Sequence, residues 1–150
     1  MKILMVCLGN ICRSPLAEGI LRSKISENHT VASAGTVSFH EGDSPDNRSI
    51  ITAKNYGIDI SKQKAQYFDK NFFDKFDKIF CMDFKNYQDV ISFSASESQK
   101  NKVVVILEEA GYDGKTEVPD PYYGTIEDFE NVYKMLDKVC DVIVEKYQLK

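Results

Sequence analysis

The sequence lacks features that would assign it to several large classes of protein. No apolar run approaches the roughly 20 residues that a membrane span needs. The run Ile3–Val6 is also shorter than the ~7–15 residues of a signal-peptide core. The formal net charge of −4 leaves no general basic footprint for nucleic acid. We therefore expect a cytoplasmic protein that binds neither membranes nor nucleic acid.

Cysteine and histidine are scarce as well. The chain has four cysteines: Cys7, Cys12, Cys81 and Cys140. This number in a chain of this length does not suggest a disulfide framework. The spacing of the first two is longer than in usual zinc sites, and His29 and His40 have no ligand-like spacing. We expect no metal and no cofactor.

What the sequence does contain is a regular alternation of apolar patterns. A length of 150 residues predicts one domain over the whole chain. Apolar runs predict strands near residues 2–6, 30–34, 78–82 and 103–107, separated by helices. The run Val103–Leu107 is wholly apolar, as a central parallel strand should be. The fold class is therefore α/β, a doubly wound four-stranded parallel sheet flanked by helices on both faces.

The intervening segments predict helices of different lengths. The longer ones run from Pro15 to about Glu27 or Asn28, from Pro45 or Asp46 to Tyr56, from Phe84 to Ile91 after an Asp83 cap, and from Ile126 to Tyr147. One or two short helices carry Phe68, Phe72, Phe73 and Phe76. Residues 92–102 are a polar connector, and residues 111–123 carry turn signals without periodicity.

The candidate site is the stretch between the first strand and the first helix. It reads Cys7-Leu8-Gly9-Asn10-Ile11-Cys12-Arg13-Ser14. Backbone N–H groups at such a loop and helix start bind anions, and a helix N-terminus beside a cation favours the thiolate of a cysteine. The planar guanidinium of Arg13 can grip two phosphate oxygens, and Ser14 could donate to the Cys7 sulfur. The stretch predicts a nucleophilic cysteine that faces a bound phosphate.

This stretch resembles the signature of the low molecular weight protein tyrosine phosphatases. The similarity extends over nearly the whole chain, through Ser33-Ala34-Gly35-Thr36, Asp46, Arg48, Gly57-Ile58, Phe76-Asp77, Met82-Asp83, Asn86 and Asp120-Pro121-Tyr122-Tyr123-Gly124. The spacing Cys-x5-Arg alone occurs in several phosphatase classes. Its position after the first strand, with Asp-Pro-Tyr-Tyr far downstream, is highly specific.

The resemblance implies hydrolysis of phosphotyrosine and other aryl phosphates through a phosphocysteine, without a metal. Cys7 would attack phosphorus, and Arg13 and the loop N–H groups would bind the phosphate oxygens. Asp120 would protonate the leaving phenolate and then deprotonate the attacking water. The implied partners are phosphotyrosine proteins or small aryl phosphates, with inorganic phosphate as product and inhibitor.

The resemblance also implies a pocket and marks two departures from the family. Phe39, Tyr122 and Tyr123 match positions that wall the family's pocket, where the two tyrosines are candidates for phosphorylation. His40 lies on the expected rim, where it could touch substrate or position water, or could be a plain exposed loop histidine. Many members have a histidine and an arginine near residues 61–66, where this chain has Lys62 and Ala65.

Alternatives remain open for the function and for three of the cysteines. An arsenate reductase uses the same fold and oxyanion loop but needs further relay cysteines, and Cys81 stands alone. A silent phosphate-binding or redox-sensing module is the other alternative. Cys12 could be a small packed residue or could close a reversible disulfide with Cys7 under peroxide. Cys81 and Cys140 fit core packing better than chemistry.

Overall fold

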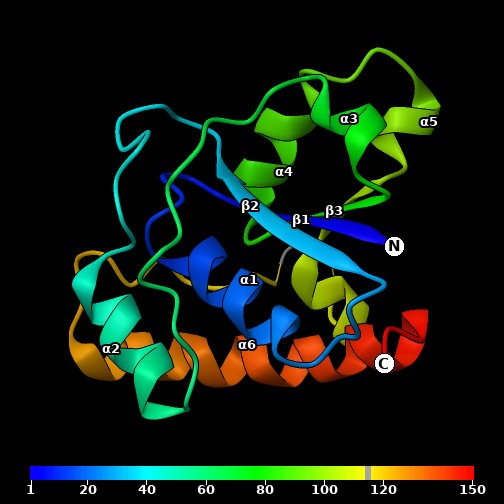
Figure 1. Cartoon of the computed structure of the whole chain (residues 1–150). Helices are drawn as coiled ribbons and strands as arrows, with labels where there is room; N and C mark the ends of the chain where they lie inside the picture. Colours follow the sequence, from blue (N-terminus) through cyan, green and yellow to red (C-terminus); the bar gives the residue numbers. More distant parts are fainter. Residues whose placement is uncertain (114–115) are drawn as a thin grey trace.

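The strands of the computed structural model, which describes residues 1–113 and 116–150, form one parallel sheet. They are β1 (Lys2–Cys7), β2 (Thr30–Gly35), β3 (Lys78–Cys81) and β4 (Val103–Val105), in the order β2-β1-β3-β4. One face is covered by α1 (Arg13–Arg22), α2 (Asn47–Asn55) and α6 (Ile126–Tyr147) (Figure 1). The other is covered by α3 (Phe72–Lys75), α4 (Phe84–Ile91) and α5 (Glu97–Lys100). The predicted fold class is confirmed.

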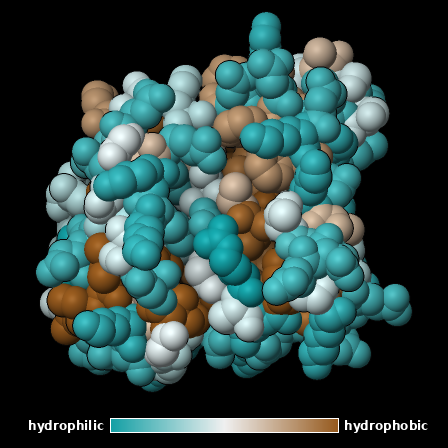
Figure 2. All heavy atoms as spheres, viewed as in Figure 1, coloured by the Kyte–Doolittle hydropathy of each residue, from teal (hydrophilic) through white to brown (hydrophobic). Residues whose placement is uncertain are grey.

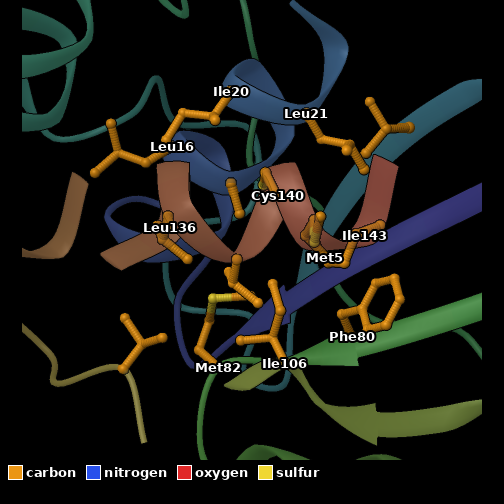
Figure 3. Close-up of a cluster of buried hydrophobic side chains, with 14 of the residues drawn as sticks. Met5, Leu16, Ile20, Leu21, Phe80, Met82, Ile106, Leu136, Cys140 and Ile143 are labelled. Carbon is orange, nitrogen blue, oxygen red and sulfur yellow. The ribbon is translucent and has the colours of Figure 1, made fainter. Parts of the chain in front are cut away.

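The core has two parts because successive side chains of a strand point to opposite faces of the sheet. Ile3 and Met5 join the larger cluster, where the sheet packs against α1 and α6 (Figure 3). Leu4 and Val6 join the smaller cluster, which includes Phe68, Phe73 and Phe76. With apolar contacts on both faces, β1 has an uninterrupted apolar run, as parallel strands covered by helices usually have.

The position of the most apolar strand differs from the prediction. β4 lies at the edge of the sheet and ends at Val105, and Ile106–Ala110 continue as a 3₁₀ helix. The run is nevertheless apolar because both faces of this edge are covered: Val103 packs into the smaller cluster, and Ile106 and Leu107 pack into the larger one. The apolar sequence of this strand therefore indicates that it is buried, not that it lies at the centre of the sheet.

Two helix predictions also need correction. The first helix ends at Arg22, five residues before Glu27, because the Ser23 hydroxyl donates to the Ile20 carbonyl and the chain turns toward β2. The connector 92–102 contains the short helix α5, capped by Ser96. It has no buried residue, so no apolar periodicity marked it in the sequence.

Other predicted elements are confirmed. α4 and α6 begin and end at the predicted residues, α2 starts after an Asp46 cap, and the phenylalanine segment contains one short helix, α3. In the segment 111–123 the described residues form no helix or strand, while 114 and 115 lie outside the described residues. No helix in the described part of the chain is long and apolar enough to cross a membrane. Hydrophilic side chains cover most of the face seen in Figure 2, and the apolar ones form separate patches.

Candidate active site

The candidate site begins at the carboxyl end of β1, where Cys7 is the last residue of the strand. β1 pairs with β2 on one side and with β3 on the other, so the chain leaves β1 toward one edge and returns on the opposite side. Such a switch point is where open parallel sheets bind their ligands. We call residues Cys7–Ser14 the phosphate loop.

The end of β2 fits closely against the phosphate loop. A Cβ atom on Gly35 would lie 2.8 Å from the carbonyl oxygen of Leu8 and 3.1 Å from the backbone nitrogen of Asn10. The backbone N–H of Thr36 donates to the Cys7 carbonyl at 3.0 Å. Only glycine leaves room at this position, and the contact fixes the course of the loop.

The Cys7 sulfur has two hydrogen-bond donors within the loop. Its Sγ lies 3.0 Å from the Ser14 hydroxyl and accepts from the Asn10 backbone N–H at 3.3 Å. The Asn10 amide donates to the Ser14 oxygen at 2.7 Å, which leaves the single hydroxyl proton free to point at the sulfur. Two hydrogen-bond donors therefore converge on the sulfur.

Asn10 holds the loop in an unusual backbone conformation. Its φ of 57° is left-handed, which asparagine tolerates better than most residues. Its Oδ1 accepts from the backbone N–H of Gln66 at 2.9 Å, so its Nδ2 must face Ser14 and Ser33. The Ser33 hydroxyl in turn donates to Glu18. A buried network of polar groups from α1, β2 and residue 66 therefore supports the loop.

The two departures from the family lie beside this network. Lys62 is exposed, and Ala65 is buried against Ile11, Cys12 and Phe129. The backbone of residue 66, and not a side chain at 62 or 65, supplies the hydrogen bond to Asn10. Support from this side of the loop is thus present with the residues that this chain has.

Arg13 joins three parts of the site. Its side chain is 3% exposed, and its Nη1 donates to Asp83 at 2.7 Å and to the Val118 carbonyl at 3.1 Å. Its Nη2 lies 3.6 Å from an Asp120 carboxylate oxygen. Sequence reasoning treated Asp83 only as a helix cap. Its place directly after β3, at the sheet edge where Cys7 lies, is the signal that could have found it.

A cavity of about 240 Å³ opens over the loop. It brings together most of the residues predicted for the site: Cys7, Leu8, Gly9, Ile11, Cys12, Arg13, Phe39, His40, Asp120, Tyr122 and Tyr123. Asn10 and Ser14 do not line it but are buried behind the loop. Val37 also lines the cavity and was not predicted. The His40 Nδ1 lies 3.2 Å from the Asp43 carboxylate at the rim.

The cavity has an exposed aromatic wall. Phe39 and Tyr123 are 88% and 96% exposed, and the Tyr122 and Tyr123 rings meet edge to face at 4.9 Å. Large flat side chains at the mouth of an anion site suit a ligand with an aromatic ring behind its charged group. The arrangement fits an aryl phosphate better than a short aliphatic one.

The other three cysteines differ from Cys7 in their surroundings. Burial raises the pKa of Cys12, and the carboxylate of Asp46 adds to this effect. Burial also raises the pKa of Cys81 and of Cys140, which lie in the two core clusters as predicted. All four cysteines are free thiols. Among the described residues, no group of three or more His, Cys, Asp or Glu side chains could hold a metal ion.

Comparison with known proteins gives one consistent result. The profile of a family described as low molecular weight phosphotyrosine protein phosphatase matches residues 2–150. The phosphatase of that name from Homo sapiens is 39% identical over 152 residues, covering 97% of this chain and 94% of the relative.

Solved structures agree with the sequence relatives. A protein tyrosine phosphatase from Entamoeba histolytica superposes with a TM-score of 0.90 and 35% identity, covering 99% of this chain and 97% of that one. Wzb of Vibrio vulnificus, solved in complex with benzylphosphonate, has a TM-score of 0.86 and 29% identity over 97% of each chain.

Proposed function

The chain belongs to the low molecular weight phosphotyrosine protein phosphatase family, and from this premise we propose that it hydrolyses phosphotyrosine and aryl phosphate monoesters through a phosphocysteine. It is a hydrolase of the protein-tyrosine-phosphatase class. We propose that residues 1–150 act as one phosphatase domain. The cytoplasmic location and the absence of nucleic-acid and membrane partners stay predictions.

In the first step, the Cys7 thiolate attacks phosphorus and the bond to the phenolic oxygen breaks. Arg13 and the backbone N–H groups of the phosphate loop bind the equatorial oxygens, where negative charge accumulates. Asp120 gives its proton to the departing oxygen, so tyrosine leaves as a neutral phenol.

In the second step, water attacks the phosphocysteine. Asp120, now ionised, takes a proton from that water, and the phosphorus–sulfur bond breaks. The departing sulfur receives the hydrogen bonds of Ser14 and of the Asn10 backbone, which stabilise it as a thiolate. Inorganic phosphate is released, and the enzyme returns to its starting state.

One observation carries this proposal: Cys7, Arg13 and Asp120 line one cavity, with the Arg13 guanidinium 3.6 Å from the Asp120 carboxylate. A nucleophile, an anion-binding cation and a proton donor thus face the same small volume, as a phosphoryl transfer requires. The partly buried Asp83 carboxylate, 2.7 Å from the guanidinium, keeps it in place before any substrate arrives.

The aromatic wall supports the choice of substrate. A related structure holds benzylphosphonate, an aromatic ring one carbon away from a phosphonate. Phe39, Tyr122 and Tyr123 line the same cavity as the loop, so an aromatic ring attached to a phosphate at the loop would meet aromatic side chains. We propose phosphotyrosine in proteins, or small aryl phosphates, as substrates, with inorganic phosphate as product and inhibitor.

The burial of Cys81 and Cys140 favours a phosphatase over an arsenate reductase. A reductase needs a second thiol that can reach the cysteine of the loop and pass electrons onward. Both residues are fully buried in the core, with raised pKa values. A thiol with no exposed surface cannot pass electrons to an external reductant, which leaves Cys12 as the candidate partner of Cys7.

Rapid-quench trapping tests the mechanism. The enzyme is mixed with phenyl phosphate in a chelator-containing buffer, quenched within milliseconds and analysed by peptide mass spectrometry. We expect one phosphoryl group on Cys7. Since Cys7 and Cys12 lie in one peptide, the Cys12→Ser variant is the matched control and should carry the same label. Absence of the label, a label on another residue, or arsenate reduction at a comparable rate would contradict the proposal.

A further inference from the structure

The first turn of α2 contacts both halves of the candidate site. On one side, the backbone N–H of Asp46 donates to the Ile11 carbonyl at 2.7 Å, and the Ser49 hydroxyl donates to the Cys12 carbonyl at 3.2 Å. On the other side, the Arg48 guanidinium donates to the Tyr122 carbonyl at 2.8 Å and to the Gly124 carbonyl at 3.1 Å. We call residues Asp120–Gly124 the acid segment. One helix start therefore ties the phosphate loop to the acid segment.

Arg48 is itself held rigidly. Its Nε and Nη2 donate to the two carboxylate oxygens of Asp46, each at 3.0 Å. These hydrogen bonds hold the pKa of Asp46 below its usual range, so the pair stays ionised at neutral pH. The guanidinium also lies 4.5 Å from the centre of the Phe129 ring, and Phe129 is buried against Ile11 and Cys12. The guanidinium plane thus has a fixed position relative to the loop.

The acid segment has few other attachments. Its own hydrogen bonds are local: the Tyr122 N–H donates to Asp120, and the Gly124 N–H donates to the Pro121 carbonyl. Within the described parts of the chain, its polar contacts to other segments come from two arginines, Arg13 and Arg48. The Asp120 side chain is 42% exposed and packs little. Before Asp120 the chain is anchored at the buried Val118, and Pro121 is also buried, so Arg48 is the polar attachment on the far side of Asp120.

We propose that Arg48, oriented by Asp46, is the positioning residue that holds the Asp120 carboxyl where it can protonate the leaving oxygen. This inference rests on the proposed acid role of Asp120. Arg48 acts through the carbonyls of Tyr122 and Gly124 and does not touch the phosphate. A lysine cannot replace it, because one ammonium cannot make a two-pronged contact to a carboxylate and bond two carbonyls at once.

The test separates positioning from charge and from folding. Arg48→Met removes the guanidinium, Arg48→Lys keeps the charge without the planar fork, and Lys54→Met is a matched control that removes a cation from the far end of the same helix. The ratio kcat/KM, which reports only the steps up to formation of the phosphocysteine, is measured with phenyl phosphate, whose leaving group needs a proton, and with 2,4-dinitrophenyl phosphate, whose leaving group does not. Inhibition by vanadate reports on the phosphate loop, and melting temperature reports on folding.

With both Arg48 variants we expect kcat/KM for phenyl phosphate to fall by about 10-fold to 100-fold, since misplacing a catalytic group by about 1 Å has this effect. The kcat/KM for 2,4-dinitrophenyl phosphate and the inhibition by vanadate should each change less than about 3-fold, because neither needs a proton from Asp120. Lys54→Met should match the unaltered enzyme. In an Asp120→Ala background, Arg48→Met should have no further effect on phenyl phosphate.

Each other result overturns the inference in a recognisable way. Equal losses on both substrates, or weaker vanadate inhibition, would show that Arg48 supports the phosphate loop. Full activity of Arg48→Lys would show that charge alone matters. If Asp120→Ala shows the leaving-group-dependent loss and Arg48→Met does not, the positioning role is wrong and the proposed function stands. If Asp120→Ala itself shows no such loss, the acid role in the proposed function fails.

Discussion

The two halves of the candidate site are built in opposite ways. In the phosphate loop, the side chains of Asn10, Arg13 and Ser14 are almost fully buried and bonded to one another or to neighbouring strands. In the acid segment, Asp120 and Tyr123 are largely exposed, and the backbone is held from a distance by Arg48. In the proposed mechanism, phosphate binding thus depends on a preorganised local structure, whereas proton transfer depends on an attachment between distant segments.

Peroxide should give the largest effect, because it acts on the nucleophile of the buried half. We expect complete inactivation that a thiol reverses. Cys7 is first oxidised to a sulfenic acid, and the Cys12 thiol then displaces the hydroxyl as water and closes a disulfide. Mass spectrometry should find this bridge, with Cys81 and Cys140 unmodified because they lie in the core and, unlike Cys7 and Cys12, do not line the cavity. In Cys12→Ser the inactivation should be irreversible. A sulfinic acid on Cys7 in the unaltered chain would exclude the protective role of Cys12.

Asp120→Ala should remove the proton donor of the exposed half and leave phosphate binding by the buried half intact. We expect kcat for phenyl phosphate to fall by about 10²-fold to 10⁴-fold, the usual contribution of a general acid. The inhibition constant of vanadate should stay within about 3-fold, since the loop makes the phosphate contacts. Steady-state kinetics and vanadate titration measure the two quantities. A parallel loss of vanadate binding would mean that the halves are not separable.

Asp83→Asn should weaken the buried half by a smaller amount. Asparagine preserves the cap of α4 but removes the charge that faces Arg13, so we expect a loss of about 1–3 kcal/mol in the free energy of unfolding. Phosphate should also inhibit less strongly. Asp89→Asn is the matched control, because it removes an exposed pairing with Lys85 and should cost less than about 1 kcal/mol. If urea unfolding shows that both variants lose the same stability, the ion pair of Asp83 with Arg13 has no special role.

Asp46→Asn should give the smallest effect, and that effect should depend on pH. Arg48 lowers the pKa of Asp46 in the folded state, so the pair stabilises the protein above the usual carboxyl pKa of about 4. That contribution is lost as the pH falls through the lowered pKa. We expect the variant to be less stable by up to about 1 kcal/mol at pH 7, with the difference shrinking as the pH falls through the lowered pKa of Asp46. Urea unfolding measures the difference in stability between the two proteins. A difference that grows as the pH is lowered would contradict this prediction.

Much of the fold could be predicted because the signals are local. The caps of α2 and α4 and the stripe of α6 place these helices where the structure has them. The end of α1 could not be predicted from the apolar pattern, because the segment after Arg22 is held outside the helix by the Ser23 bond to Ile20 and by a hydrogen bond from Ser26 to Leu149, near the other end of the chain. The edge position of β4 could not be predicted from its sequence either, because helices cover this edge strand as fully as a central strand and its residues are equally apolar.

In the candidate site, too, local features could be predicted and contacts between distant segments could not. The residues of the phosphate loop are eight consecutive positions. The sequence by itself therefore determined that a cysteine and an arginine lie between a buried strand and the start of a helix. Only the tertiary structure decided that Asp83 pairs with Arg13 and that Arg48 holds the acid segment. These partners lie about 70 positions apart, and the order of the strands, not any local pattern, brings them together.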